Sequence, residues 1–298
     1  MQRGISMELI QLGENTYYIK NATNIGVYKT GDTEVYLIDS GNDKDAGKKI
    51  LKIIEAQGWS VKGIITTHSN ADHIGGNKLI QERTNCPIYA SGIEKSFTEF
   101  PVLEPSFLFG GYPFKDLRNK FLLAKESVVT DIENQLPEGL SYFTLKGHYF
   151  DMIGIKTKDD VYFLADALFS VETITKYHLF FVYDVREYLK TLDFLETLEG
   201  KWFVPSHCEA TANIVELIQL NRNKVCEVAD KIYDMCGNEN TFEDILKGIF
   251  DTYNLVMNTN QYVLIGSTVR SYLSYLYDEG KIGFELKDNK MYWRQILF

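Results

Sequence analysis

One short stretch, residues 67–76, constrains the fold of this chain more than any other. It runs Thr-His-Ser-Asn-Ala-Asp-His-Ile-Gly-Gly and holds two of the five histidines. The apolar run 63–66 before it predicts a buried strand, and the helix-like segment 77–82 follows it. The polar cluster is therefore expected on a strand-to-helix loop, where α/β sheets carry ligand sites. Imidazole and carboxylate groups packed this densely favour a transition-metal site.

Three further candidate ligands follow predicted strands elsewhere in the chain. They are His148 after strand 142–145, Asp166 at the end of strand 161–165, and His207 at the end of strand 202–206. A single histidine or aspartate at a strand end is commonly structural. Four such strand ends in the order HxxxDH, GH, AD and SH instead favour a metal site.

The motif set resembles that of a known superfamily. The segments THSNADHIGG, GHYFDMIGI, FLADALF and VPSHCEA look like successive motifs of the metallo-β-lactamase-fold hydrolases. This resemblance implies an αββα four-layer sandwich in a catalytic domain of residues 1–210, with a one- or two-metal centre at one edge. The superfamily pattern is HxHxDH, and Asn70 stands where its second histidine is expected.

The resemblance also implies a role for each candidate ligand. One metal would take His68, Asn70 and His148, the second would take Asp72, His73 and His207, and Asp166 would bridge both. In such a centre a metal lowers the pKa of water toward about 7, giving hydroxide at neutral pH. Asp72 would hold this hydroxide and pass its proton to the leaving group, which makes it the predicted catalytic residue.

Asn70 leaves three outcomes open, because a neutral amide oxygen is a poorer zinc ligand than imidazole. The first site could hold a weak or substrate-recruited metal beside one tightly held metal at the second site. Alternatively, Asn70 coordinates through its oxygen or through water, or the centre has lost efficient hydrolysis. Zinc is the expected cofactor, as one or two ions, with iron or manganese as alternatives. The diiron pattern HxExDH is absent, which argues against redox chemistry.

Composition narrows the class of protein. The chain has 298 residues, 45% of them hydrophobic and 24% charged, as in ordinary soluble domains. A net charge of −10 argues against nonspecific binding to nucleic acid or an anionic membrane. We find neither an apolar run long enough for a membrane span nor a secretory signal. The four scattered cysteines suit reduced thiols in the cytoplasm, and Cys208 is predicted to be a small buried residue rather than a ligand.

The remaining segments of the catalytic domain have distinct patterns. Residues 8–40 alternate as four strands, and the family implies that Asp39, after the fourth, supports the metal loop; a cap is the alternative. Aromatic residues crowd between 93 and 135 without a steady period, broken by Pro and Gly, which predicts an irregular cover. The resemblance makes this insertion a lid over the site, with plain core packing as the alternative. Residues 45–58 and 180–198 are predicted helices, and His178 is predicted to be structural.

Residues 211–298 predict a small, mainly helical domain. Helices are expected at 213–236, after an N-cap at Thr241, and at 261–277, followed by a hairpin around 287–289. This order resembles the winged-helix domain that follows the catalytic domain in some relatives. From residue 261 onward, five basic residues stand against four acidic ones, a weak basis for DNA binding. We therefore expect packing against the catalytic domain, or a subunit contact in a homo-oligomer.

Together these patterns predict a metal-dependent hydrolase of a small-molecule ester, thioester, lactone or amide. One alternative is a phosphodiesterase or RNase of the same fold, against which the acidic balance counts. The other is a non-catalytic metal-binding or sensory protein, suggested by Asn70 and the C-terminal helices. The sequence contains no P-loop, HExxH or GxSxG motif.

Overall fold

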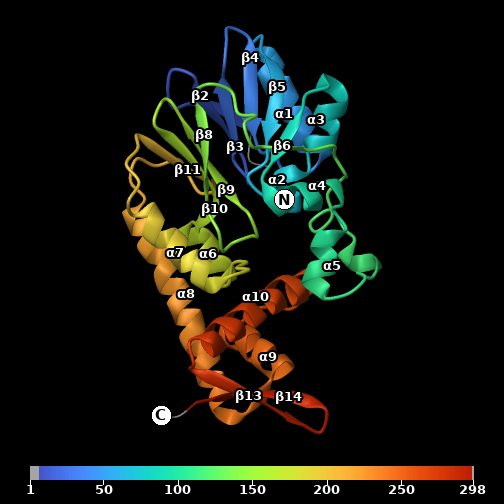
Figure 1. The fold of residues 1–298 in the computed structure, drawn as a ribbon, viewed down its shortest axis with the longest axis vertical. Helices are drawn as coiled ribbons and strands as arrows, with labels where there is room; N and C mark the ends of the chain where they lie inside the picture. The colour runs from blue at the N-terminus through green and yellow to red at the C-terminus, as the bar shows by residue number, and fades with distance from the viewer. Residues whose placement is uncertain (1–6, 297–298) are drawn as a thin grey trace.

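Two β-sheets face each other in the computed structural model, which describes residues 7–296 (Figure 1). The first sheet has the strand order β1-β2-β3-β4-β5-β6-β7, and the second has the order β11-β10-β9-β8. The first is formed by β1 (Glu8–Gln11), β2 (Thr16–Lys20), β3 (Ile25–Lys29), β4 (Glu34–Ile38), β5 (Ser60–Ile65), β6 (Ile88–Ala90) and β7 (Thr130–Asp131). The second is formed by β8 (Leu140–Thr144), β9 (Ile153–Thr157), β10 (Val161–Phe169) and β11 (Trp202–His207).

Helices cover the outer faces of both sheets. On the first sheet lie α1 (Lys44–Ala56) and α3 (Asn77–Thr84), whose Ile50 and Ile80 belong to the same buried cluster as Leu37 of β4. On the second lie α7 (Val185–Leu195) and α8 (Val215–Met235). A separate apolar cluster that includes Ile65 and Phe163 fills the space between the sheets. Burial of apolar area at about 25 cal/mol per Å² therefore holds four layers together, and the predicted αββα sandwich is confirmed.

The C-terminal region follows the predicted order of helix, helix, helix and hairpin. After α8 come α9 (Phe242–Thr252), α10 (Thr259–Asp278), β13 (Ile282–Lys287) and β14 (Lys290–Gln295), with β12 (Asn240–Thr241) beside β14. The predicted N-cap at Thr241 is confirmed, because Thr241 and Asp244 form a capping box. Asp288 and Asn289 adopt left-handed conformations, which suits a two-residue hairpin turn.

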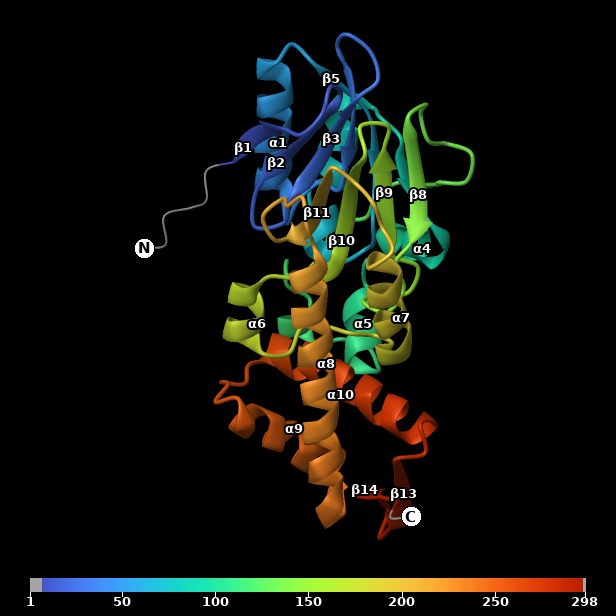
Figure 2. The ribbon, with the colours of Figure 1, turned by 90° about the vertical axis from the view of Figure 1, so that its left-hand side faces the viewer.

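Helix α8 joins the sandwich to the C-terminal helices (Figure 2). Its buried Asn221 accepts a hydrogen bond from the Phe169 N–H and donates one to the Phe169 carbonyl, both at the end of β10. Farther along α8, Val228 and Ile232 share one apolar cluster with residues of α9 and α10. The domain boundary at residues 210/211 stays a prediction, because this cluster runs continuously across it. Within residues 7–296, no helix has both the length and the apolar character to cross a membrane.

The predicted lid contains more regular structure than expected. It forms α4 (Gly92–Glu99), α5 (Leu103–Phe109) and the 3-10 turn η1 (Lys115–Leu117). Its Leu108 and Leu117 pack against Val263 of α10, so the C-terminal region does pack on the rest of the chain. Helix α5 and the turn η1 are stabilised because these buried leucines find a partner in α10, which the local sequence does not reveal.

The predicted helix 180–198 is wrong at its start. Helix α7 begins at Val185, where the Asp184 side chain caps it by accepting a bond from the Glu187 N–H. The preceding residues 179–184 have no helical structure, and a short helix, α6 (Val171–Tyr177), precedes them. His178 stacks on Tyr253 at 4.7 Å, in agreement with its predicted structural role.

The loop before α7 depends on Gly147. This residue has φ +113°, and a Cβ there would lie 2.2 Å from the backbone nitrogen of Tyr188. The Gly147 carbonyl also accepts hydrogen bonds from the Tyr183 and Asp184 N–H groups, both at 2.9 Å. No side chain fits this approach, so Gly147 sets the position of the adjacent His148.

We predict that Gly147→Ala lowers the free energy of unfolding by about 2 kcal/mol or more, because it adds both strain and a backbone clash. Denaturant unfolding measures the change. Gly31→Ala is the control, since a Cβ at Gly31 meets nothing within 4 Å. Equal stability of the two variants would contradict this view of the loop.

Candidate metal centre

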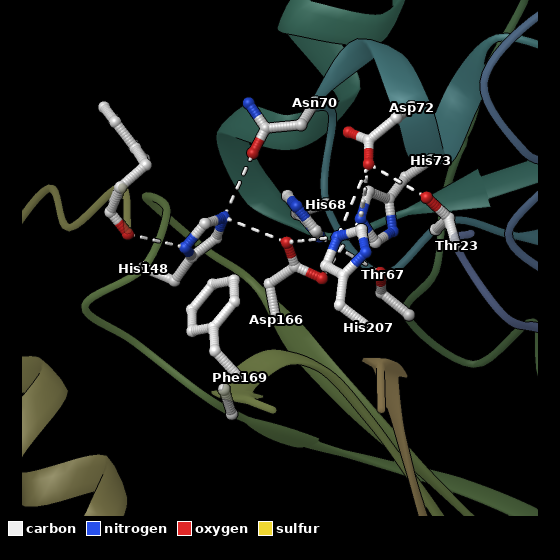
Figure 3. Close-up of polar contacts among 12 residues, drawn as sticks. Thr23, Thr67, His68, Asn70, Asp72, His73, His148, Asp166, Phe169 and His207 are labelled. Atoms are coloured by element: carbon white, nitrogen blue, oxygen red, sulfur yellow. Dashed lines mark hydrogen bonds and ion pairs between the residues drawn. The ribbon is translucent and has the colours of Figure 1, made fainter. Parts of the chain in front are cut away.

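All seven predicted ligands converge at one edge of the sandwich (Figure 3). His68 and Asn70 lie on the loop after β5, while Asp72 and His73 lie on the single helical turn α2 (Ala71–Ile74). His148 follows β8, and His207 is the last residue of β11. The strand-end pattern in the sequence therefore located these side chains correctly, although the metal-ligand role of each stays a prediction.

Asp166 reaches the centre in a different way from the one predicted. It does not end its strand but lies inside β10, which continues to Phe169. The pairing of β10 with β11 shifts register between Phe163 and Ala165 and again before Phe169, and Ala165 has φ +48°. Such an irregularity bends a strand and redirects a side chain. Asp166 lies in this irregular part of β10, and its side chain lies between the histidines.

The ligand atoms form two neighbouring clusters. His68, His148 and Asp166 make the first, and Asp72, His73 and His207 make the second, with atoms in each within 4.8 Å of one another. Asp166 also faces the second cluster: its Oδ1 lies 3.1 Å from His73 Nε2, and its Oδ2 lies 3.1 Å from His207 Nε2. The same Oδ2 is 3.6 Å from His148 Nε2. A carboxylate in this position is suited to bridge two cations.

Fixed acceptors set the tautomers of three histidines. The Nδ1 atoms of His73, His148 and His207 each lie 2.8 Å from an oxygen: Asp39 Oδ2, the Phe181 carbonyl and the Ala22 carbonyl, respectively. A carbonyl or carboxylate oxygen has no hydrogen to give, so each Nδ1 donates. In the neutral ring, Nε2 then carries a lone pair directed into the centre.

His68 follows the same rule through Thr67. The Thr67 hydroxyl donates to Asp39 Oδ2 at 2.7 Å, so its oxygen is free to accept from His68 Nδ1 at 3.2 Å. Asp39 thus supports two histidines, one directly and one through Thr67, and it also accepts the Thr67 N–H at 2.8 Å. The expectation that Asp39 supports the metal loop is confirmed.

Three buried polar atoms of the centre lack a hydrogen-bond partner. His68 Nε2, His73 Nε2 and Asp166 Oδ1 are buried and have no hydrogen-bond partner among residues 7–296. Buried acceptors left in this way are costly unless a cation satisfies them. Two ligands about 2.0 Å from a tetrahedral ion lie about 3.3 Å apart, close to the separations found here. The residues present therefore fit divalent cations.

Charge in the centre favours a cation as well. Burial opposes protonation of His207, but Asp166 and Asp72 outweigh it and raise the pKa of His207 to about 9. The same carboxylates raise the pKa of His73 well above its usual range against the effect of burial. Burial lowers the pKa of His68 and of His148. Metal binding would replace the protons that the carboxylates attract to His73 and His207.

Asn70 presents its oxygen to the first cluster. Its Nδ2 donates to Glu104 Oε1 at 2.7 Å, and its Oδ1 lies 3.2 Å from His148 Nε2. The sequence patterns did not single out Glu104, nor Glu94, which accepts from the Ser69 N–H and hydroxyl. Burial raises the pKa of Glu94 to about 7. The available signal for Glu104 was an acidic residue between the apolar residues 101–103 and Pro105, since acidic residues are seldom buried without partners; Glu94, next to Lys95, has no such signal.

Two other features lie outside the clusters. Cys208 places its Sγ 3.5 Å from the Leu168 carbonyl, and burial raises the pKa of its thiol to about 12, as suits the predicted structural role. An open cleft of about 830 Å³ lies between α5, α7 and α10, with Phe107, Tyr183 and Arg270 in its lining. None of the seven candidate ligands lines this cleft, so the function is argued from the metal centre.

A family model described as the metallo-beta-lactamase superfamily matches residues 19–207. The chain belongs to this superfamily. Solved structures agree on the fold: a beta-lactamase domain protein from Burkholderia ambifaria has a TM-score of 0.74 at 15% identity, covering 98% of this chain and 95% of its own. A metallo-beta-lactamase family protein from Thermus thermophilus has a TM-score of 0.66 at 15% identity, covering 98% and 99%.

Two curated relatives carry the name hydroxyacylglutathione hydrolase. The protein of Rhodopseudomonas palustris (strain BisB18) is 29% identical over 130 residues, which are 43% of this chain and 42% of the relative. The protein of Erythrobacter litoralis (strain HTCC2594) is 43% identical over 56 residues, 17% of this chain and 22% of the relative. The matched segments span less than half of either relative.

We predict that Asp39→Asn weakens metal binding by about 10- to 100-fold, because an amide group cannot accept from all three donors that face the carboxylate. Competition between metal-depleted protein and a chromophoric chelator measures the Kd for Zn²⁺. Asp45→Asn is the matched control, since Asp45 is an exposed residue paired with Lys48. Unchanged affinity in Asp39→Asn would show that the hydrogen bonds of Asp39 do not orient the histidines.

Proposed function

We propose that the protein is a metal-dependent hydrolase of small-molecule acyl compounds, with thioesters as the first class of substrate. The observation that carries the proposal is the convergence of four histidine Nε2 atoms around the Asp166 carboxylate. The choice of thioesters is supported by the name of the two relatives, because an acylglutathione is a thioester. Esters, lactones and amides follow as alternatives with the same acyl chemistry.

The proposed cofactor is zinc, with iron or manganese as the alternatives that histidine and carboxylate ligands also suit. His68, Asn70 and His148 would hold one ion, and Asp72, His73 and His207 the other, with Asp166 shared. A bound divalent cation supplies Lewis acidity and makes water acidic enough to give hydroxide near neutral pH. The protein residues then have to orient the substrate and move protons.

Asp72 is placed to move a proton. Its Oδ2 accepts a hydrogen bond from the Thr23 hydroxyl at 2.9 Å and lies 3.4 Å from His207 Nε2. Its side chain is 40% exposed, whereas that of Asp166 is only 6% exposed. Asp72 can therefore reach a substrate from the open side of the centre. We assign it the general base and acid roles, first taking a proton from water and then giving it to the leaving group.

Aromatic side chains form the wall beside the histidines. Phe169 lies nearly parallel to His207, with ring centroids 6.1 Å apart, and 5.7 Å from His148. Phe181 meets the edge of His148 at 5.6 Å. This apolar wall excludes water from one side of the centre and strengthens the electrostatic interactions within it.

The C-terminal region is proposed to support the lid rather than to bind nucleic acid. The support for this role is the packing of Leu108 and Leu117 of the lid against Val263 of α10. As part of this proposal, we interpret residues 211–298 as a winged-helix-like domain. The partner we propose is a small-molecule substrate, met in the cytoplasm.

We predict that the metal-loaded protein hydrolyses small acyl thioesters faster than matched phosphodiesters, and that chelation removes the activity. Zn²⁺ added back to the depleted protein should restore it. Initial rates on thioester, ester, lactone, β-lactam and phosphodiester substrates test this directly. Lack of turnover on all of them with metal bound would favour a metal-binding or sensory protein, and faster phosphodiester cleavage would favour a phosphodiesterase.

Asp72→Asn should lower kcat by about 10²- to 10⁴-fold, because an amide neither takes nor gives the required proton. Metal content must be measured on the same preparation, since Asp72 also belongs to the second cluster. The comparison variant is again Asp45→Asn, which should keep wild-type kcat. A fully metallated Asp72→Asn protein with wild-type kcat would remove Asp72 from the mechanism.

A further inference from the structure

Glu104 is a buried acid on the lid, and its side chain contacts the metal loop. It lies in α5 with 4% of its surface exposed, between the apolar residues 101–103 and Pro105. A carboxyl group in such surroundings is costly unless it is hydrogen-bonded. Its partner is Asn70, whose Nδ2 donates to Glu104 Oε1 at 2.7 Å.

The oxygen of Asn70 is free to face the metal cluster because Asn70 does not cap the helix that it precedes. It stands at the N-cap of α2, where an asparagine side chain commonly accepts a backbone N–H, yet it makes no such bond. Its amide has an oxygen at one end and an NH₂ group at the other, so only one orientation presents an acceptor to the metal cluster. Glu104 Oε1 accepts from Asn70 Nδ2, so this contact holds the orientation with Nδ2 toward the lid and Oδ1 toward the cluster.

The selected orientation places the Asn70 oxygen where it can bind a cation. Asn70 Oδ1 lies 3.2 Å from His148 Nε2, whose ring already donates through Nδ1 to the Phe181 carbonyl. In the neutral histidine, two acceptors therefore face each other, as two ligands of one ion do. The opposite orientation would direct the NH₂ group into the cluster, where it would repel a cation.

We propose that Glu104 is a positioning residue that holds the Asn70 oxygen toward the first cluster as a fourth donor beside His68, His148 and Asp166. The inference rests on the proposed metal centre. It gives the first site two nitrogen and two oxygen donors, with the amide oxygen fixed from outside by the lid. Asn70 then acts as a ligand where the superfamily pattern has a histidine.

The first test is a titration of the metal-depleted full-length chain with Co²⁺ and, separately, Zn²⁺. Visible absorption of Co²⁺ reports its coordination, and a competing chelator gives Kd for each equivalent. Glu104→Leu should weaken one of the two equivalents by about 10- to 100-fold, the usual effect of removing a group that orients a ligand, and leave the other within about twofold. Equal affinities in Glu104→Leu and the wild type would overturn the proposal.

A substitution at residue 70 distinguishes loss of the Asn70 amide orientation from a general structural effect of Glu104→Leu. Aspartate has an oxygen at both ends, so it needs no partner to present one to the cluster. Glu104→Leu should therefore weaken the first site in the Asn70 background but strengthen it, or leave it unchanged, in the Asn70→Asp background. The same loss in both backgrounds would overturn the proposal.

Leu108→Ala is the control for disturbance of the lid, because Leu108 is buried in α5 and packs in the cluster that includes Val263. It should keep both metal affinities, and a loss equal to that of Glu104→Leu would overturn the specific role of Glu104. A wild-type chain that binds no ion would instead contradict the metal centre itself. Failure of the hydrolase proposal is distinguishable, since it would appear as intact metal binding without turnover.

Discussion

The direction of the hydrogens on four imidazole rings is the constraint on which the site depends. Each Nδ1 donates to a fixed oxygen, so in the neutral ring each Nε2 faces the centre with a lone pair, and Asp166 adds a carboxylate among them. Acceptors brought together in a buried place repel one another unless a proton or a cation lies between them. Asp39 fixes two of the rings. Its own backbone is left-handed, with φ 65°, a strained conformation for a residue other than glycine.

The rest of the fold serves this arrangement of acceptors. The two sheets bring separate strand ends to one edge, and the irregular pairing of β10 with β11 places Asp166 among them. The predicted lid, residues 93–135, adds contacts from outside, since Glu94 holds Ser69 and Glu104 holds Asn70, the two residues that follow His68. The lid in turn rests on α10 through Leu108 and Val263. The C-terminal helices are thus connected to the metal loop through packed side chains.

The local sequence predicts most strands and most residues of the site, whereas the remaining features depend on tertiary contacts. The positions of most strands, the N-cap at Thr241 and the hairpin turn at Asp288 depend on nearby residues and were predictable. The position of Asp166 inside β10 was not, because its bulge arises from pairing with a strand that comes much later in the chain, at 202–207. Glu104 was missed because the burial of an acid depends on a partner, Asn70, that lies far away in the chain.

Anomalous diffraction from crystals of the metal-loaded protein tests the central claim most directly, because it places each cation relative to its ligands. The account predicts two peaks, one in each cluster, with the Asn70 oxygen bonded to the ion that His68 and His148 hold. A single peak in the second cluster, or a first ion with the Asn70 side chain turned away from it, would contradict the account.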